Sequence, residues 1–236
     1  MKLASELGSW YEPLRNRVDL DKLVKVISLE YHKKQVYPKP ENIFRMFKLL
    51  APRDIRVIIL GQSPYHDGTA TGVAFGVEND GVSNGVFDGA SDGVKNIIPS
   101  ILSIIKAEVE NTVYPLEPRE FDYTLMKWVN QGVFMYNTSL TVVQGIPNSH
   151  ENIWMDFTKG VMEILNEMPG LIWCLWGNEA KKCKNYINPT FHHILEAAHP
   201  SAECYKKAAG FYDCDHFNLV NEIIRGQNGR EFEIKW

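Results

Sequence analysis

Four short polar segments carry the residues of this sequence that are best suited to chemistry. Each follows an apolar run directly: residues 61–66 (GQSPYH), 137–139 (NTS), 177–178 (GN) and 199–201 (HPS). The amide of Asn137 offers both a donor and an acceptor, the pair that reads a base edge. The imidazole of His199 could be a core group, a ligand or an electrophile. Taken singly, each segment also suits an ordinary strand-to-helix turn, because such turns require Gly, Asn, Ser and Pro.

The apolar runs before these segments have the pattern of strands buried on both faces of a parallel sheet, and they cover residues 56–60, 132–136, 171–176 and 193–198. Helical patterns precede, separate and follow them, at residues 20–33, 41–50, 94–109, 121–131, 152–167, 178–187 and 214–225. This alternation predicts a three-layer α/β/α sandwich around a central four-stranded parallel sheet. Ligands bind at the carboxyl edge of such a sheet, so the four polar segments should lie together there.

Length and composition favour one soluble globular domain over residues 1–236. The chain has 44% hydrophobic and 23% charged residues, with no internal repeat or long linker, which excludes disordered and fibrous classes. No apolar run approaches the roughly 20 residues of a membrane span, and the amino end lacks the apolar core of a signal peptide. We therefore expect a cytoplasmic protein of bacterial or viral origin, or a nuclear one, that is not secreted and does not bind a membrane.

Net charge and cysteine spacing narrow the choice of partners and cofactors. The net charge of −4 argues against a non-specific nucleic-acid coat protein, but it permits a site that engages a few phosphates. The four cysteines show no CxxC spacing, which favours free thiols in a reducing compartment over a metal site. We expect neither a metal nor a cofactor.

Several motifs, in order and spacing, resemble the family-1 uracil-DNA glycosylases. They are VIILGQSPYH (57–66), GVAFGV (72–77), NTSLTV (137–142), LWGNEAKK (175–182), HHILEAAHPS (192–201) and GFYDCDHF (210–217). The segments SWYEPL (9–14) and VYPKPENIFRMF (36–47) are similar to the amino end of that family, so the resemblance covers nearly the whole chain. It implies a DNA repair enzyme that hydrolyses the N-glycosidic bond of uracil, or a related base, flipped out of DNA.

The resemblance also implies roles in a uracil pocket for residues that match the motifs. Phe75 would stack on the flipped uracil, and Asn137 would pair with its polar edge. The backbone of Gln62 would contact a carbonyl oxygen, while the ring of Tyr65 would stand against C5 and exclude the methyl group of thymine. His199 would donate a hydrogen bond from a neutral imidazole to the uracil oxygen that gains negative charge as the bond breaks.

The partners implied by the resemblance are DNA and proteins that act on such enzymes. Ser100, Asn178 and Ser201 would present hydroxyl, amide and backbone N–H groups to DNA phosphates around the flipped nucleotide. The DNA would contain uracil and be single- or double-stranded. A proteinaceous glycosylase inhibitor or a replication protein is a further possible partner, and the expected state is a monomer.

The sequence departs from the family at the position of the water-activating aspartate, where it has Ser63. A serine hydroxyl can hold a water, but it is neither a base nor an anion at pH 7, so the catalytic pair would be His199 with an impaired Ser63. Asp67, four residues further on, either compensates for this loss or is a surface turn residue.

The second departure lies in the loop after His199, where Glu203 replaces the leucine that the family wedges into the duplex. A glutamate would bring negative charge against the base stack, whereas wedges are normally apolar. Tyr205, flanked by Lys206 and Lys207, is a candidate replacement wedge. The alternative is a solvent-exposed variant loop.

These departures leave three hypotheses open. The first is a glycosylase with reduced activity. The second is a catalytically inactive protein that binds uracil or another flipped base in DNA, such as a viral or phage replication or transcription accessory. The third is that Ser63 was introduced by engineering.

Overall fold

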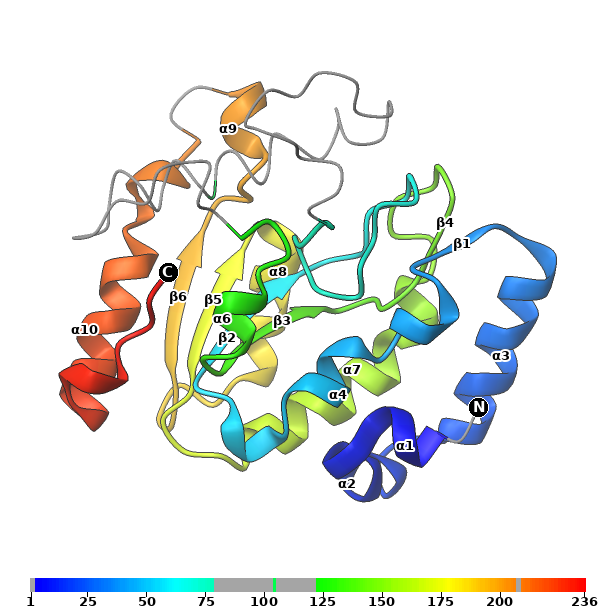
Figure 1. The fold of residues 1–236 in the computed structure, drawn as a ribbon, viewed down its shortest axis with the longest axis horizontal. Coiled ribbons are helices and arrows are strands. Elements are labelled where there is room, and N and C mark those ends of the chain that lie inside the picture. The colour runs from blue at the N-terminus through cyan, green and yellow to red at the C-terminus, as the bar shows by residue number, and fades with distance from the viewer. Residues whose placement is uncertain (1–2, 79–103, 105–121, 207–208) are drawn as a thin grey trace.

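Four parallel strands form the central sheet in the order β3-β2-β5-β6 (Figure 1). The strands are β2 (Val57–Gly61), β3 (Val133–Asn137), β5 (Ile172–Trp176) and β6 (His193–Ala197). The computed structural model describes residues 3–78, 104, 122–206 and 209–236. Within them the predicted four-stranded parallel sheet, flanked by helices, is confirmed.

The helices and the short antiparallel pair surround this sheet (Figure 1). The pair consists of β1 (Val36–Tyr37) and β4 (Val142–Val143). The α-helices are α1 (Leu3–Leu7), α2 (Tyr11–Arg15), α3 (Leu20–Lys33), α4 (Arg45–Leu49), α6 (Met126–Val129), α7 (Glu151–Asn166), α8 (Asn178–Lys182), α9 (Ala202–Tyr205) and α10 (His216–Asn228). Short 3₁₀ helices are η1 (Gly8–Trp10), η2 (Pro40–Asn42), η3 (Pro52–Asp54), η6 (Cys183–Tyr186), η7 (Tyr212–Cys214) and η8 (Arg230–Phe232).

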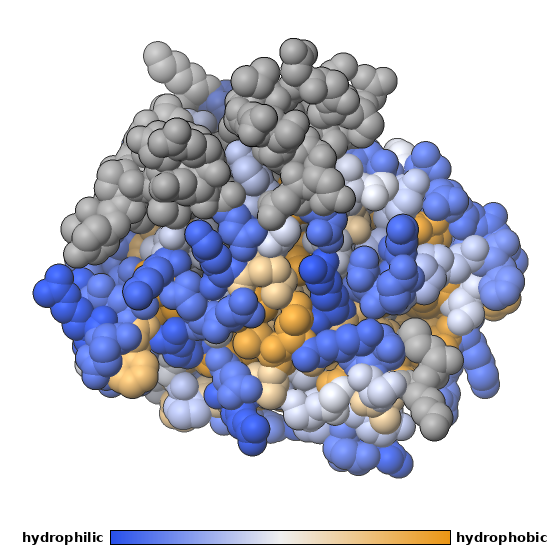
Figure 2. Space-filling model, in the orientation of Figure 1, coloured by the Kyte–Doolittle hydropathy of each residue, from blue (hydrophilic) through white to orange (hydrophobic). Residues whose placement is uncertain are grey.

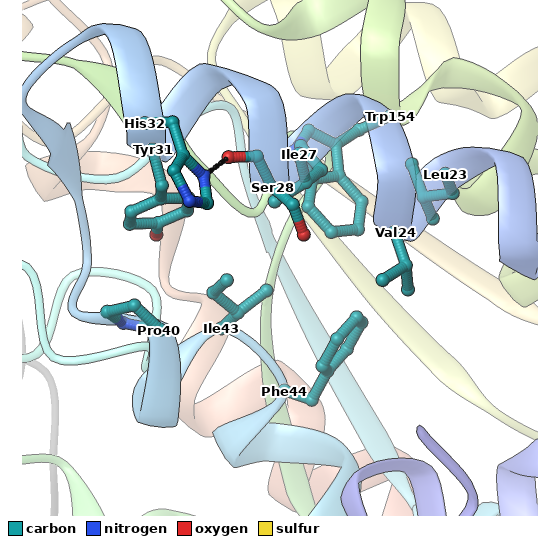
Figure 3. A pocket seen from close by; sticks show the side chains of 10 residues that line it. All are labelled: Leu23, Val24, Ile27, Ser28, Tyr31, His32, Pro40, Ile43, Phe44 and Trp154. Atoms are coloured by element: carbon teal, nitrogen blue, oxygen red, sulfur yellow. Dashed lines mark hydrogen bonds between the residues drawn. The ribbon is translucent and has the colours of Figure 1, made fainter. Parts of the chain in front are cut away.

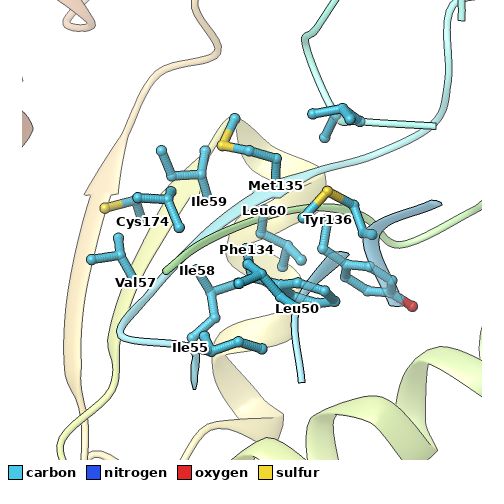
Figure 4. Packing of buried hydrophobic residues seen from close by; sticks show 14 of the residues in the cluster. Leu50, Ile55, Val57, Ile58, Ile59, Leu60, Phe134, Met135, Tyr136 and Cys174 are labelled. Carbon is cyan, nitrogen blue, oxygen red and sulfur yellow. The ribbon is translucent and has the colours of Figure 1, made fainter. Parts of the chain in front are cut away.

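The two central strands are buried on both faces, as their uninterrupted apolar runs predict. Residues Val57 to Leu60 of β2 are each 0% exposed and pack among the side chains in Figure 4. The prediction of full burial is wrong for β6, where His193 and Glu196 are exposed. The exposed positions of β6 carry polar side chains, at an edge where only β5 pairs with it, whereas the apolar run of β3 at the other edge is buried.

Aromatic side chains fill the space between the sheet and both helical layers. On one face, Phe134 of β3 stacks on Trp10 with 5.3 Å between ring centroids, and Phe47 of α4 meets it edge-on at 5.7 Å. On the other face, Trp176 of β5 lies 6.2 Å from Phe217 of α10. Alternation of side chains along strands puts these groups on opposite faces. The sheet is therefore packed between two apolar interfaces.

Several predicted helices are shorter than their sequence patterns. The pattern at residues 121–131 gives only α6, because the Asp122 carboxylate accepts hydrogen bonds from the backbone N–H groups of Thr124 and Lys127, and Leu125 has a φ of +60°. The pattern at 41–50 gives a 3₁₀ turn and then α4. The helix expected at 94–109 lies outside the described residues except at Ile104, which is buried.

The described surface in the view of Figure 2 is largely hydrophilic, with hydrophobic side chains gathered near the middle of the face, between α6 and α4. Among the helices that the structure describes, none combines the length and the apolar character needed to cross a membrane.

Candidate active site at the carboxyl edge of the sheet

Strand register brings the polar segments to one edge of the sheet. Gly61 pairs with Asn137 across β2 and β3, and Trp176 pairs with Ala197 across β5 and β6. Thr138 donates backbone and side-chain hydrogen bonds to the carbonyl groups of Gly61 and Gln62, at 3.1 and 3.0 Å. The segments after β2 and β3 are therefore fastened to each other at the point where the strands end.

Gly61 leaves the space that the Asn137 and Phe75 side chains occupy. A Cβ atom on Gly61 would lie 2.2 Å from the Oδ1 atom of Asn137 and 3.3 Å from a ring carbon of Phe75. Phe75 has a φ of +64°, which a residue with a bulky side chain rarely adopts. Such strain is concentrated at functional sites, where the surrounding structure maintains it. An amide and an aromatic ring thus meet above the end of β2.

Tyr65 supports the strained backbone of Phe75. Its hydroxyl group donates a hydrogen bond of 3.2 Å to the Phe75 carbonyl group. Burial raises the pKa of the Tyr65 phenol, and the nearby Asp67 carboxylate adds to this effect. Tyr65 is therefore a neutral donor at physiological pH, and its ring is held in one place.

His199 reaches the same cluster from the end of β6. Its ring centroid lies 5.7 Å from that of Phe75. Gly177 permits this approach, because a Cβ atom there would lie 3.0 Å from the Cβ of His199, and because its φ of +94° favours glycine. The end of β5 thus leaves room for the imidazole.

Hydrogen bonds fix the tautomer of His199. The backbone N–H of Ser201 donates to the Nδ1 atom of His199 at 3.2 Å, and the Ser201 hydroxyl lies 2.7 Å from the same atom. Burial lowers the pKa of the imidazole, which favours its neutral form. Because Nδ1 accepts, the single ring proton of neutral His199 lies on Nε2. Ser201 therefore orients His199, and its predicted contact with a DNA phosphate stays a prediction.

We predict that His199 is neutral and protonated on Nε2 at pH 7, and that it becomes charged only below the ordinary histidine pKa of about 6.5. Since the folded state disfavours the proton, this group contributes stability above pH 6.5 that is lost as the pH falls. Nitrogen-15 NMR of the imidazole reports the tautomer and the titration directly. Protonation of Nδ1 at pH 7, or a pKa above 6.5, would contradict this assignment.

Trp176 and His216 are two site residues that sequence reasoning did not identify. The Trp176 ring lies 5.5 Å from Phe75, and its Nε1 donates to the Nδ1 atom of His216 at 3.0 Å. Burial lowers the pKa of His216 to about 4, so this histidine stays neutral and accepts the bond. The available signal was their position inside the LWGNEAKK and GFYDCDHF motifs. Trp176 therefore packs against the Phe75 ring, and His216 holds Trp176 in place.

Ser63 and Asp67 lie on the loop after β2. Ser63 is half-buried, one residue beyond Gln62, whose carbonyl group accepts a hydrogen bond of 2.9 Å from the Ser139 backbone N–H. The Oδ1 atom of Asp67 accepts hydrogen bonds from the backbone N–H and the hydroxyl of Thr69, at 3.1 and 2.6 Å. Asp67 therefore closes its own turn, which favours the interpretation of a turn residue.

In the loop after His199, the Glu203 carboxylate binds the loop itself. Its carboxylate accepts hydrogen bonds from backbone N–H groups of the same loop, on residues Ala209, Gly210, Phe211 and Tyr212. Burial favours the protonated form, but these donors outweigh it and lower the pKa of Glu203. The returning arm of the loop therefore binds this charge, and its position relative to a duplex stays a prediction.

The other predicted contact residues divide between exposed positions and residues outside the description. Asn178 is exposed at the start of α8, and Tyr205 and Lys206 are exposed at the end of α9. Tyr205 is 83% exposed. Ser100 and Lys207 lie outside the described residues.

The described residues show neither a metal site nor an apolar cavity that adds to the site at this edge. Within the described part of the chain, no three His, Cys, Asp or Glu side chains are placed to hold a metal ion. Cys174, Cys183 and Cys214 are free thiols, as predicted. A cavity of about 280 Å³ lies elsewhere, beneath α3, and its lining is mostly apolar (Figure 3).

Solved structures share this fold. Mimivirus uracil-DNA glycosylase aligns with a TM-score of 0.80 and 23% identity over 97% of this chain and 86% of its own. A mimivirus UNG variant in complex with UGI aligns with a TM-score of 0.79 and 24% identity, over 97% of this chain and 88% of its own. The fold is therefore that of the uracil-DNA glycosylases.

Sequence comparisons identify the family. The family model described as "Uracil DNA glycosylase superfamily" matches residues 47–225. The uracil-DNA glycosylase of Clostridioides difficile is 37% identical over 97% of this chain and 96% of its own, and that of human herpesvirus 7 is 33% identical over 89% and 78%. The chain belongs to the uracil-DNA glycosylase superfamily.

Proposed function

We propose that this protein hydrolyses the N-glycosidic bond of uracil in DNA, and that Ser63 slows the step in which water attacks the sugar. The observation that carries the proposal is the geometry of His199, where Ser201 occupies Nδ1 and the ring proton therefore lies on Nε2. Family membership supports the glycosylase activity independently.

A base leaves the duplex before such an enzyme can act on it, and the site then reads its faces and its edge. We assign the face to Phe75 and the polar edge to Asn137, whose side chains already lie together above Gly61. The Gln62 backbone would contact a uracil carbonyl oxygen. Tyr65, held against the Phe75 carbonyl group, would exclude a methyl group on C5.

The leaving base becomes an anion as the bond breaks. A donor that is already oriented stabilises this developing charge without the cost of reorganising solvent. His199 would supply that donor from Nε2. Because burial lowers the pKa of the imidazole, His199 would act in this role in its neutral form.

DNA binding needs phosphate contacts and a group that fills the gap left by the flipped base. We assign phosphate contacts to Ser100, Asn178 and Ser201, and the wedge to Tyr205 with help from Lys206 and Lys207. A proteinaceous inhibitor is a further proposed partner, since a mimivirus UNG variant of the same fold has been solved in complex with UGI.

The second candidate function, which Ser63 would favour, is binding of uracil-containing DNA without cleavage. A gel assay distinguishes the two functions. Labelled single- and double-stranded oligonucleotides with one uracil are incubated with excess protein and then treated with alkali, which cleaves abasic sites. We expect cleavage at the uracil position, and faster cleavage in the single strand. Selective binding without cleavage would establish the binder instead.

A further inference from the structure

We infer that Glu203 is a positioning residue that fastens the loop after His199 and thereby presents Tyr205 to the DNA duplex. This role rests on the proposed function, and it deepens that function by assigning a determinant of activity on double-stranded DNA. The resemblance implies that the family has its wedging leucine at the position of Glu203. In this chain the wedge and the group that holds it would be separate residues.

The geometry of the carboxylate supports this assignment. Its Oε1 atom accepts hydrogen bonds from the N–H groups of Gly210, Phe211 and Tyr212 at 2.9, 2.6 and 3.2 Å, and its Oε2 atom accepts from Ala209 at 3.2 Å. One side chain on the outgoing arm thus satisfies successive donors on the returning arm. Hydrogen bonds to a charged acceptor are roughly twice as strong as those between neutral groups. We call this arrangement the Glu203 clasp.

The clasp connects the loop to both walls of the candidate site. On the outgoing side, α9 begins three residues after His199, and the Ala202 backbone N–H donates to the His199 carbonyl group at 2.9 Å. On the returning side, Phe211 packs edge-on against Trp176 at 5.0 Å, and Trp176 packs against Phe75. A change in the clasp would therefore move the loop relative to the imidazole and the base-stacking ring.

Helix α9 projects beyond the carboxyl edge of the sheet, where we propose that DNA binds. Figure 1 shows α9 above the carboxyl end of β6, beyond the strand that leads to His199. Tyr205 ends this helix with 83% of its surface exposed, and Lys206 beside it is exposed as well. An exposed aromatic ring can stack on a base, and a neighbouring cation can bind phosphate. The clasp lowers the ordering cost of inserting that ring, because it already joins residue 203 to residues 209–212.

The test compares Glu203→Ala, Glu203→Gln and Tyr205→Ala with the parent by single-turnover excision from single- and double-stranded DNA of the same sequence. We expect Glu203→Ala to slow duplex excision at least about tenfold, because several donors lose their acceptor. Single-strand excision should change by no more than about twofold, since no wedge is needed there. Glu203→Gln should fall between, because its amide oxygen still accepts.

A double variant and a matched control separate positioning from general stability. Glu203→Ala combined with Tyr205→Ala should be no slower on duplex than the slower single variant, since both changes remove the same insertion. Asp213→Ala, which removes an exposed carboxylate just beyond the clasp, should leave the duplex to single-strand ratio unchanged. Equal losses on both substrates, or additive losses in the double variant, would overturn the inference.

Failure of the proposed function is distinguishable from failure of this inference. If the parent excises no uracil even from single strands, the glycosylase proposal fails, and duplex opening is measured with 2-aminopurine placed beside the uracil. The parent should then raise the fluorescence by unstacking this base, and Glu203→Ala and Tyr205→Ala should not. An unchanged rise with Glu203→Ala would overturn the role of the clasp.

Discussion

Ser63→Asp should excise uracil about 10²- to 10³-fold faster than the parent protein, the usual effect of one preorganised electrostatic group. A carboxylate at this position can orient the attacking water and stabilise the cationic sugar, which a neutral hydroxyl cannot do. The backbone is prepared for the change, because the Gln62 carbonyl group is held by Thr138 and Ser139. Single-turnover excision from single-stranded uracil DNA measures the gain.

Asp67→Asn is the matched control for this gain. Its carboxylate closes a turn with Thr69, so its removal should cost far less activity than Ser63→Asp adds. If the activity of Ser63→Asp also vanishes with Asp67→Asn, then Asp67 is the group that handles water. If Ser63→Asp binds uracil DNA without faster excision, the proposed role of position 63 is wrong.

Asn137→Ala should lower the preference for uracil-containing over ordinary DNA by about 10²-fold, because base groups that leave water would then stay unpaired. The Asn137 side chain lies over Gly61 and beside Phe75, so its removal leaves the stacking ring in place. Competition binding with matched oligonucleotides measures the preference. The overall affinity for ordinary DNA should change little.

Asn178→Ala provides the comparison, since it removes an amide at the same edge of the sheet. If Asn178 binds phosphate, its loss weakens binding to both kinds of DNA equally and reduces the salt dependence. A selective loss of uracil binding from Asn178→Ala, with none from Asn137→Ala, would reverse the two assignments.

The sequence predicts the sheet well because burial on both faces requires an uninterrupted apolar strand. The apolar run Val57–Leu60 is an example, since all of its residues are buried. The exposure of β6 falls on its polar residues His193 and Glu196, whereas the apolar β3, at the other edge of the sheet, is buried. The helix lengths were also not predicted. The Asp122 contacts, which place the start of α6 at Met126, arise from loop geometry.

The site was predictable where residues follow strands and unpredictable where loops turn back on themselves. Asn137 and His199 come directly after strands, so topology alone brings them together. The bond from Ser201 to His199 and the Glu203 clasp depend on loop conformations that no periodicity encodes. The contact of Trp176 with His216 joins residues 40 positions apart, and its residue types alone gave no sign of pairing.

Release of free uracil is the most direct test of the central claim that this chain is a glycosylase. The parent protein, in excess over single-stranded uracil DNA, is incubated at pH 7, and the released base is identified and quantified by mass spectrometry. The account predicts free uracil that accumulates with time, at a rate that His199→Ala reduces and Ser63→Asp raises. Stable binding of the uracil DNA by all three proteins with no free base in any of them would contradict it.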